Sequence, residues 1–260
     1  MSKRGKVTRT QQKVETAQSS YPHFRDYMKK LPKELANPKY LLELDRSMRD
    51  LDPLNIIYPV GDALFVHIFR PEGKPLQYVV IEPTMDESTD KIYQKVLDRL
   101  VEIAFQQEKI DVADDITPIL VNLLNDVVVI DTKTFFGSSL SSKIHLNQQQ
   151  YDIIKYFLLR ERVGYSKLEP LFNDPYLEDI HCTGIGHIKA VHKIFQAVRM
   201  NIDFSNDLEL NKYILETSER VERPVSDARP VVDAVMPDGS RVNFIYGREI
   251  SREGSSFTVR

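Results

Sequence analysis

The sequence predicts an α+β fold, with two small subdomains that follow a disordered basic tail. Apolar residues recur at helical spacing in several segments, whereas β-branched and aromatic runs between turn residues indicate short strands in others. In the second half the order is helix, strands, helix, strands, which predicts a sheet covered by helices on one face. The composition shifts at 132–142 (TKTFFGSSLSS). We therefore expect the tail over residues 1–20 and the subdomains over residues 21–140 and 141–260.

The first 20 residues are basic and carry few apolar side chains. Lys3, Arg4, Lys6, Arg9 and Lys13 are accompanied by no acid before Glu15. Such a segment cannot offset its ordering entropy by burial, so we expect it to be mobile. Two interpretations stay open: an arm that binds an acidic protein, anionic lipid or nucleic acid, or a solubilising tail.

The first subdomain begins with short helical pieces interrupted by prolines. Tyr40, Leu44 and Met48 fall on one helix face, and a longer helix is predicted over residues 86–107. The apolar run over residues 116–130 fits either a helix or a strand.

Strands are predicted between these helices. Residues 55–69 and 76–83 form two apolar runs on either side of a turn at residues 71–75, which indicates an antiparallel hairpin. His67 lies within the first run and has no partner at metal-ligand spacing, so we interpret it as a packed or edge histidine.

The second subdomain contains clear helix signals. Asn147 is a cap for a helix that reaches Arg162, and Gly164 ends it. At residues 173–179 (NDPYLED), a cap residue, a proline and an early acid predict a short helix. The elements that follow are strands at residues 180–183, 187–193 and 198–204 and a helix from Ser205 to Val221.

The segment from Arg223 to Arg260 is predicted to be strands joined by tight turns. Two β-branched runs flank the turn sequence PDGS, and a further strand follows a turn at residues 253–255. Because side chains alternate along a strand, Arg241 and Arg260 should face away from the core, while their neighbours Val242 and Val259 face it. The chain stops at Arg260 without a capping residue or a polar C-terminal segment, so we expect it to be a fragment.

This segment is rich in arginine. Between residues 220 and 260 there are seven arginines and no lysine, which suits planar recognition of carboxylate or phosphate. Six acids lie in the same window, so surface ion pairs are the competing interpretation. The arginines are Arg220, Arg223, Arg229, Arg241, Arg248, Arg252 and Arg260.

The rest of the chain excludes several classes of function. The net charge of −3 gives no general reason to expect nucleic-acid binding, and no apolar run approaches the roughly 20 residues of a membrane span. The single cysteine, Cys182, excludes an internal disulfide and fits a reducing, cytoplasmic compartment. No nucleotide, hydrolase or zinc motif occurs, and Gly184-Ile185-Gly186 joins two strands and so predicts a plain turn. His181, His187 and His192 are predicted to be surface or packed histidines rather than metal ligands.

Several short sequence motifs resemble those of a known family. LEPLFNDPYLEDI, GIGHIKAVHKIF, RPVSDARPVVDAVMPDGSRVNF and SFTVR resemble the N-terminal domain of the secretion ATPase superfamily, which covers type II and type IV secretion and pilus assembly. In the first half, IIYPVGDALFVHIF and YVVIEP are similar to archaeal members. The nearest likeness is to the motor ATPases of the archaellum, the rotating archaeal flagellum.

The resemblance implies a regulatory and assembly domain of a hexameric motor. In that family a RecA-like domain with Walker A and Walker B elements follows, and ATP with Mg²⁺ lies between the two domains. This chain contains neither element, so we expect no hydrolysis by it alone and no cofactor bound to it alone. The family's phosphate-contacting arginines correspond to Arg241 and Arg260, with Arg229 and Arg223 as weaker candidates and no catalytic residue in this chain.

The implied partners are a homo-hexamer, a membrane platform protein and a RecA-like accessory protein, at the cytoplasmic face of the membrane. No nucleic acid is expected. One alternative is a type IV pilus or type II secretion ATPase. An alternative of another class is a non-enzymatic interaction module whose basic tail or arginine-rich end binds nucleic acid.

Overall fold

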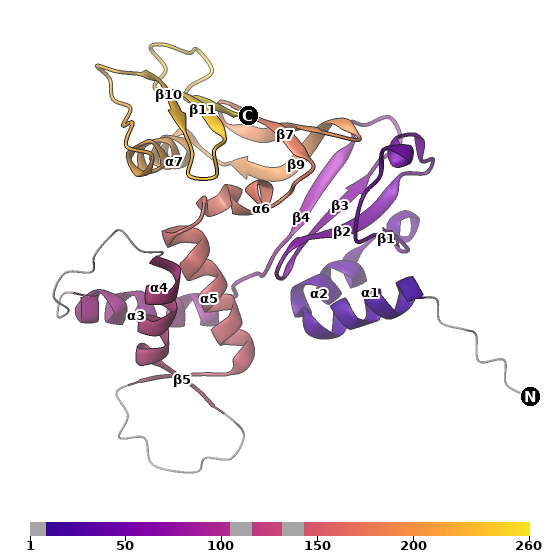
Figure 1. Ribbon diagram of the computed structural model, residues 1–260, viewed down its shortest axis with the longest axis horizontal. Helices are drawn as coiled ribbons and strands as arrows, with labels where there is room; N and C mark the ends of the chain where they lie inside the picture. The colour runs from indigo at the N-terminus through magenta and orange to yellow at the C-terminus, as the bar shows by residue number, and fades with distance from the viewer. Residues whose placement is uncertain (1–8, 105–115, 132–142) are drawn as a thin grey trace, which may run out of the picture. The chain divides into compact units, whose positions relative to one another are not determined.

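The computed structural model describes residues 9–104, 116–131 and 143–260 (Figure 1). The chain divides into two compact units, one formed by Met1–Glu82 with Pro170–Arg260 and the other by Pro83–Glu169. Both contain helices and strands, and the predicted α+β class is confirmed. The boundary expected near residue 140 lies outside the described residues, and the division falls at Glu82/Pro83 and Glu169/Pro170 instead.

The first unit is built on one ten-stranded sheet. Its order is β1-β2-β3-β4-β9-β8-β7-β12-β11-β10, so strands from both ends of the chain share it. Pairing is parallel at β1–β2 and β4–β9 and antiparallel elsewhere. The strands are β1 (Lys39–Tyr40), β2 (Asn55–Gly61), β3 (Leu64–Phe69), β4 (Gln77–Ile81), β7 (Leu177–Thr183), β8 (Gly186–His192), β9 (Gln196–Phe204), β10 (Val231–Val235), β11 (Arg241–Ile245) and β12 (Ser256–Val259).

The two halves of this sheet join at β4 and β9 through a short ladder. Only Gln77 and Tyr78 of β4 pair with β9 residues. Beyond them the side-chain amide of Asn201 continues the ladder: its Oδ1 accepts from Val80 N at 2.9 Å and its Nδ2 donates to Val80 O at 3.2 Å. An amide side chain therefore supplies the pair of hydrogen bonds that a further backbone residue would make.

Helices α1 (Arg9–Ser20) and α2 (Pro22–Lys30) pack with the N-terminal strands. Ala17 of α1 and Phe24 of α2 lie in a cluster with Phe65, whose ring is 4.3 Å from that of Phe24. The expected mobile tail is therefore wrong from Arg9 onward, because α1 buries Ala17; residues 1–8 lie outside the described part of the chain.

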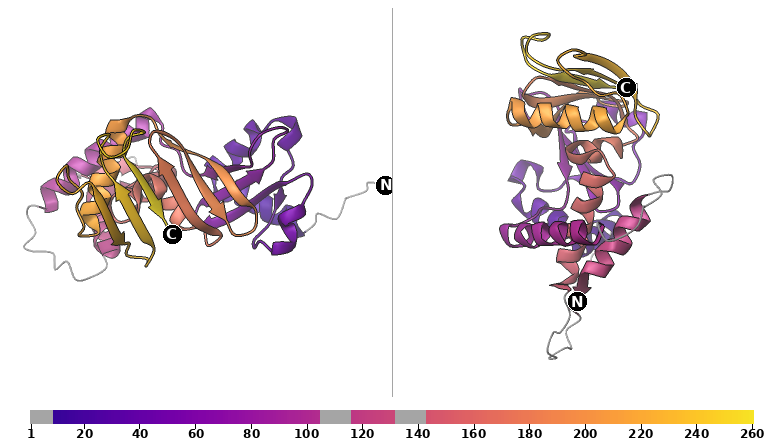
Figure 2. Two further views of the ribbon diagram at one scale, coloured as in Figure 1. Left: turned by 90° about the horizontal axis from the view of Figure 1, so that it is seen from above. Right: turned by 90° about the vertical axis from the view of Figure 1, so that its left-hand side faces the viewer.

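Helix α7 (Asp207–Arg220) covers one face of the C-terminal strands, as the right-hand view of Figure 2 shows. The Asn206 side chain caps it by accepting from Glu209 N. Tyr213 of α7 and Phe204 of β9 both contact the ring of Phe257, which lies on the inner face of β12. The predicted covering of one sheet face is confirmed here.

Three local predictions are wrong. Residues 40–48 do not form a helix: Tyr40 ends β1, and a 3-10 helix follows at Arg46–Asp50. The single run at residues 55–69 is split into β2 and β3, because the chain reverses at Asp62-Ala63 and Ala63 adopts a φ of 62°. The other 3-10 helices are Lys33–Leu35 and Ser166–Leu168.

The third error concerns residues 173–179. Helix α6 (Glu169–Phe172) ends before them, and β7 begins at Leu177. The Asp174 side chain accepts from Tyr176 N at 2.8 Å and forms a turn. An Asp in a turn makes the same local hydrogen bond as a helix cap, which explains why the pattern misled.

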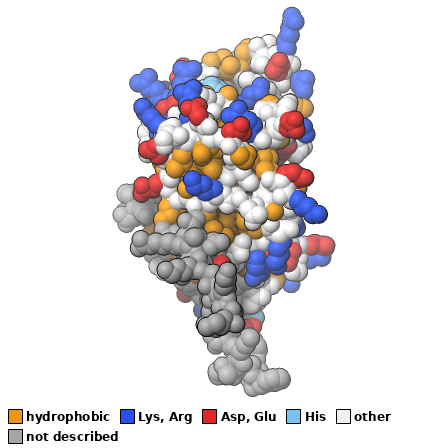
Figure 3. Space-filling model, turned by 90° about the vertical axis from the view of Figure 1, so that its right-hand side faces the viewer, with side chains coloured by type: hydrophobic (Ala, Val, Ile, Leu, Met, Phe, Trp, Pro, Cys, Tyr) orange, Lys and Arg blue, Asp and Glu red, His pale blue; other side chains and the backbone are white. Residues whose placement is uncertain are grey.

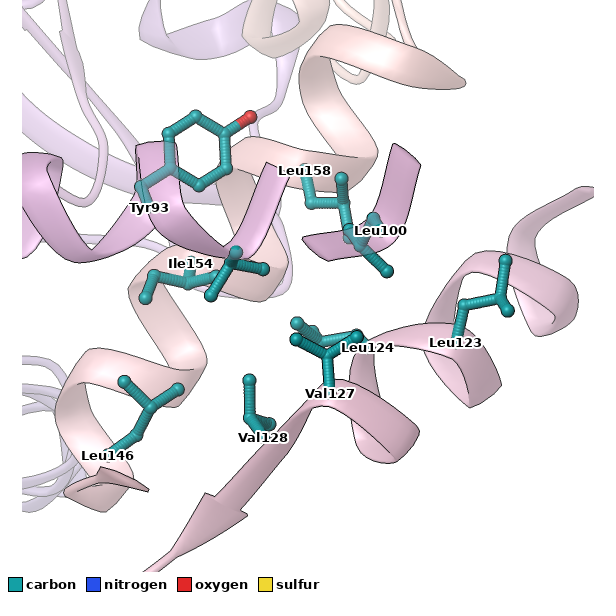
Figure 4. Close-up of a cluster of buried hydrophobic side chains, with 10 residues drawn as sticks. Tyr93, Leu100, Leu123, Leu124, Val127, Val128, Leu146, Ile154 and Leu158 are labelled. Atoms are coloured by element: carbon teal, nitrogen blue, oxygen red, sulfur yellow. The ribbon is translucent and has the colours of Figure 1, made fainter. Parts of the chain in front are cut away.

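The second unit is a small helical body with its own core. It contains α3 (Glu87–Ala104), α4 (Ile116–Val127), α5 (Gln148–Arg162) and a parallel pair of short strands, β5 (Val128–Ile130) and β6 (Ile144–Leu146). Figure 4 shows Leu124, Val127 and Leu158 turned toward one another within this core. Asn147 and Gln150 form a complete capping box at the start of α5, so the predicted cap is confirmed.

Candidate functional site

A hollow of about 870 Å³ lies on the first unit, on the sheet face opposite to α7. Strands β10, β11 and β12 bury Val232, Val242 and Val259 on their inner face, so the alternate residues of these strands face the hollow. The hollow is lined mainly by these outward residues, Asp233, Val235, Arg241, Asn243, Thr258 and Arg260, together with Val221, Arg223, Ala234 and Val242.

Arg241 and Arg260 lie side by side in this hollow. Arg241 N donates to Arg260 O, and Arg260 N donates to Arg241 O, both at 2.8 Å. Residues that exchange both hydrogen bonds in an antiparallel pair have Cα atoms about 5.5 Å apart and side chains on the same face. Both side chains are exposed, so the strand parity predicted for them is confirmed.

Arg223 reaches the hollow from the segment that follows α7. Its backbone N–H donates to Ser218 O at 2.9 Å, and the Ser218 hydroxyl accepts from Val225 N at 3.2 Å. Ser218 is fully buried, so a serine of α7 anchors the turn that carries Arg223. Glu222 adopts a φ of 58°, which reverses the chain at this point.

The predicted arginines fall into different environments. Arg223, Arg241 and Arg260 line the hollow, whereas Arg229 does not and lies in an exposed turn with Ser226. Arg248 forms an ion pair with Asp207, as the surface interpretation predicts. The guanidinium groups of Arg223 and Arg241 have no hydrogen bond or ion pair with any described residue, which leaves their donors available.

Polar groups that the sequence did not single out accompany the arginines. Asn243 donates from Nδ2 to Asp233 Oδ1 at 2.9 Å, and Thr258 lies 3.3 Å from the Nδ1 of His181. Asn243 and Thr258 are directly opposite one another in the β11–β12 register. Strand parity could have found both, because each is two residues from an arginine on the same face.

A second polar cluster is buried elsewhere in the first unit. Asp174 Oδ2 accepts from the hydroxyls of Tyr58 at 2.7 Å and Tyr78 at 2.6 Å. His192 Nε2 lies 3.3 Å from the Tyr58 hydroxyl, and its Nδ1 accepts from the backbone N–H groups of Ile194 and Phe195. These contacts join β2 and β4 to the segments beside β7 and β8.

Burial controls the protonation of this cluster. It raises the pKa of Asp174, although the two tyrosine hydrogen bonds act in the opposite direction. It lowers the pKa of His192 to about 4, and the pKa values of Tyr58 and Tyr78 are raised well above the usual value. A neutral His192 with hydrogen on Nε2 can donate to Tyr58, which donates to Asp174, so the network is internally consistent.

His67 and Cys182 are both packed inside the first unit, as expected for a packed histidine. His67 is fully buried between the Tyr27 hydroxyl and Asn55 Oδ1, each at 2.7 Å, and burial lowers its pKa to about 4. Cys182 is free and buried, and burial raises its pKa to about 12. The side chain of His187 lies outside the described set. No group of three or more His, Cys, Asp or Glu among the described residues could hold a metal ion.

Gly184 lies in the turn between β7 and β8, where it allows a neighbouring segment to pack closely, as expected for a plain turn. Its φ is 75°, its N–H donates to Ser255 O at 3.2 Å, and a Cβ there would collide with the carbonyl oxygen of Glu253. The β7–β8 turn is therefore covered by the segment before β12, and only glycine permits this approach.

Comparisons with known proteins give archaeal relatives. No family model matches the chain. It is 35% identical to the uncharacterized protein MJ0900 of Methanocaldococcus jannaschii over 98% of this chain and 48% of that protein. It is 28% identical to the uncharacterized protein MJ1288 of the same organism over 83% of this chain and 82% of that protein. The chain thus spans about half the length of MJ0900.

Among solved structures, the chain is similar to the VirB11 ATPase of the Brucella suis type IV secretion system, crystallised with sulphate. The identity is 22% and the TM-score 0.31, over 36% of this chain and 29% of that one. A TM-score of this size does not indicate a shared fold. Separately, no helix among the described residues is long and apolar enough to cross a membrane.

Proposed function

We propose that this chain is the N-terminal domain of a hexameric motor ATPase of the secretion superfamily, most specifically one that powers assembly and rotation of an archaellum. The observation that carries the proposal is the facing pair Arg241 and Arg260, joined by Arg223 in one hollow. Support comes also from the sequence words around them, PDGSRVNF and SFTVR, which resemble that family.

Within the proposal, the arginines contact the phosphates of ATP bound with Mg²⁺ on a RecA-like domain of the complete protein. An arginine on a separate domain loses a charge-assisted contact when phosphate leaves, and so can couple hydrolysis to domain movement. This chain supplies the sensing groups, and the RecA-like domain supplies the chemistry. Arg229, which lies outside the hollow, has a weaker claim to such a contact.

The wider setting belongs to the same proposal. The complete protein forms a homo-hexamer and acts at the cytoplasmic face of the membrane through a platform protein and a RecA-like accessory protein. A type IV pilus or type II secretion role is the alternative within the family. Affinity for an archaellum platform protein against a pilus platform protein distinguishes the two.

The face seen in Figure 3 bears on the nucleic-acid alternative. Lysine and arginine side chains are interspersed there with acids and apolar groups, and on that face they do not form a patch of one sign. Nucleic-acid binding draws on clustered positive charge, so this face offers it little support.

The decisive test is Arg241→Ala in the complete protein. We expect ATP turnover to become uncoupled from rearrangement of the hexamer, with the fold of this chain unchanged. Arg248→Ala is the matched control, because it removes an arginine of the same segment that is already paired with Asp207. Unchanged nucleotide affinity, turnover and assembly in Arg241→Ala would exclude the proposed contact.

A further inference from the structure

Arg260 has a carboxylate neighbour on the adjacent strand. Its Nε lies 3.6 Å from Asp179 Oδ1, and the β7–β12 register, in which Val259 is opposite Ile180, brings the two residues together. The Arg260 side chain is 73% exposed and that of Asp179 34% exposed. This is a solvent-accessible ion pair at the rim of the hollow.

The contact leaves most of the guanidinium unused. Arg248 offers a comparison, since both its Nε and its Nη2 donate to Asp207 Oδ2. Arg260 makes a single contact through Nε, beyond hydrogen-bond length, and its two η nitrogens have no partner among the described residues. A side chain held this lightly can exchange partners at low cost, because exposed ion pairs contribute little to stability.

The charges around the hollow give Asp179 a distinct position. Asp233 is engaged by the Asn243 amide at 2.9 Å. Arg241 has no carboxylate partner among the described residues and directly faces Arg260, an arrangement in which like charges repel. Asp179 is the acid that offsets this repulsion at Arg260.

We infer that Asp179 is the resting partner of Arg260 and competes with the phosphate ligand for it. The inference rests on the proposed function, since it concerns the same hollow. When phosphate binds, Arg260 leaves Asp179; when phosphate is lost, Asp179 takes Arg260 back. Asp179 is thus a specificity-determining residue, because only an anion that binds Arg260 more tightly than Asp179 does can displace it.

The test uses this chain with inorganic pyrophosphate as the probe, at low ionic strength, with binding followed by NMR titration. We expect Asp179→Asn to bind pyrophosphate about 2- to 5-fold more tightly than wild type, because the competing ion pair is worth up to about 1 kcal/mol. Glu178→Gln is the matched control: it removes the same charge from the neighbouring exposed position and should change affinity by less than about 1.5-fold on the same scale.

A double variant, Asp179→Asn with Arg260→Ala, identifies the mechanism. The gain should disappear, because it depends on releasing Arg260. Persistence of the gain without Arg260, or an Asp179→Asn affinity equal to or weaker than wild type, overturns the inference.

Arg241→Ala separates this inference from the proposed function. If Arg241→Ala loses affinity while Asp179→Asn gains none, the site stands and the role of Asp179 falls. If Arg241→Ala binds pyrophosphate as wild type does, or no variant binds it, the proposed function falls and the inference falls with it.

Discussion

The cluster around Asp174 and the hollow around Arg241 are both polar regions of the same sheet unit, yet they treat charge in opposite ways. Asp174 is buried, and its oxygens accept hydrogen bonds from two tyrosine hydroxyls and a backbone N–H. Arg241 is exposed, faces another arginine and has no side-chain partner among the described residues. In the first region the charged group is hydrogen-bonded to other groups of the protein. In the second region the charged group stays available to a ligand.

This difference separates groups that stabilise a fold from groups that serve binding. A buried carboxylate with all partners in place helps to specify one arrangement of strands, and removing a partner is costly. Facing like charges on an exposed surface gain nothing for the fold. The charged groups of the hollow have few partners within the protein, whereas those of the Asp174 cluster have many. The hollow is therefore the better candidate for a binding site.

The largest expected effect comes from breaking the satisfied region. Asp174→Ala should lower the free energy of unfolding by about 3–5 kcal/mol, because the Tyr58 and Tyr78 hydroxyls stay buried without their acceptor. Urea denaturation followed by circular dichroism measures this change.

Tyr78→Phe is the matched control for that variant. It removes one hydroxyl but leaves Asp174 with its other partners, so the loss should be about 1–2 kcal/mol. A loss in Asp174→Ala no larger than that in Tyr78→Phe would show that the carboxylate does not organise the cluster.

The next effect is a dependence of stability on pH. His67 and His192 each have a pKa near 4 in the folded protein because of burial, against 6.5 when exposed. As the pH falls from 7 to 5, the unfolded chain gains protons that the folded chain does not, so stability should fall by about 2 kcal/mol for each histidine. Asp174, with its raised pKa, acts in the opposite sense.

A variant of one histidine isolates the contribution of that residue to the pH dependence of stability. His67→Gln should reduce the stability difference between pH 7 and pH 5 by about 2 kcal/mol, whatever its effect at pH 7. A difference equal to that of wild type would mean that His67 takes up its proton in the folded state.

The smallest effect tests the unsatisfied region. Arg241→Ala should leave the free energy of unfolding unchanged or raise it by a few tenths of a kcal/mol, because it relieves repulsion with Arg260. Arg248→Ala, which removes the ion pair with Asp207, should lower it by about 0.2–1 kcal/mol. Thermal denaturation of the two variants in parallel measures the contrast. A clear loss in Arg241→Ala would mean that Arg241 supports the fold.

Local signals in the sequence are sufficient to predict much of this fold. The cap at Asn147, the PDGS hairpin and the outward parity of Arg241 and Arg260 all depend on neighbours along the chain. Each is fixed by backbone geometry that a few residues determine.

Long-range features could not be predicted in this way. Asp174 has the pattern of a helix start, and only the fold brings it to Tyr58 and Tyr78, which precede it by about a hundred residues. The joining of β4 to β9 and the proximity of Asp179 to Arg260 likewise depend on strand order. No local period encodes which strands become neighbours.

The place of β12 in the sheet has a consequence for the order of folding. This strand lies between β7 and β11, so the β10–β11 hairpin is attached to the other strands only through β12. The hairpin can close early because its pairing is local, whereas β12 must find β7 across more than seventy residues of intervening chain. Until it does, β7 presents an open edge, the kind of surface that drives association between chains. The two arginines meet when β12 pairs with β11, whereas Asp179 comes beside Arg260 only when β12 also pairs with β7.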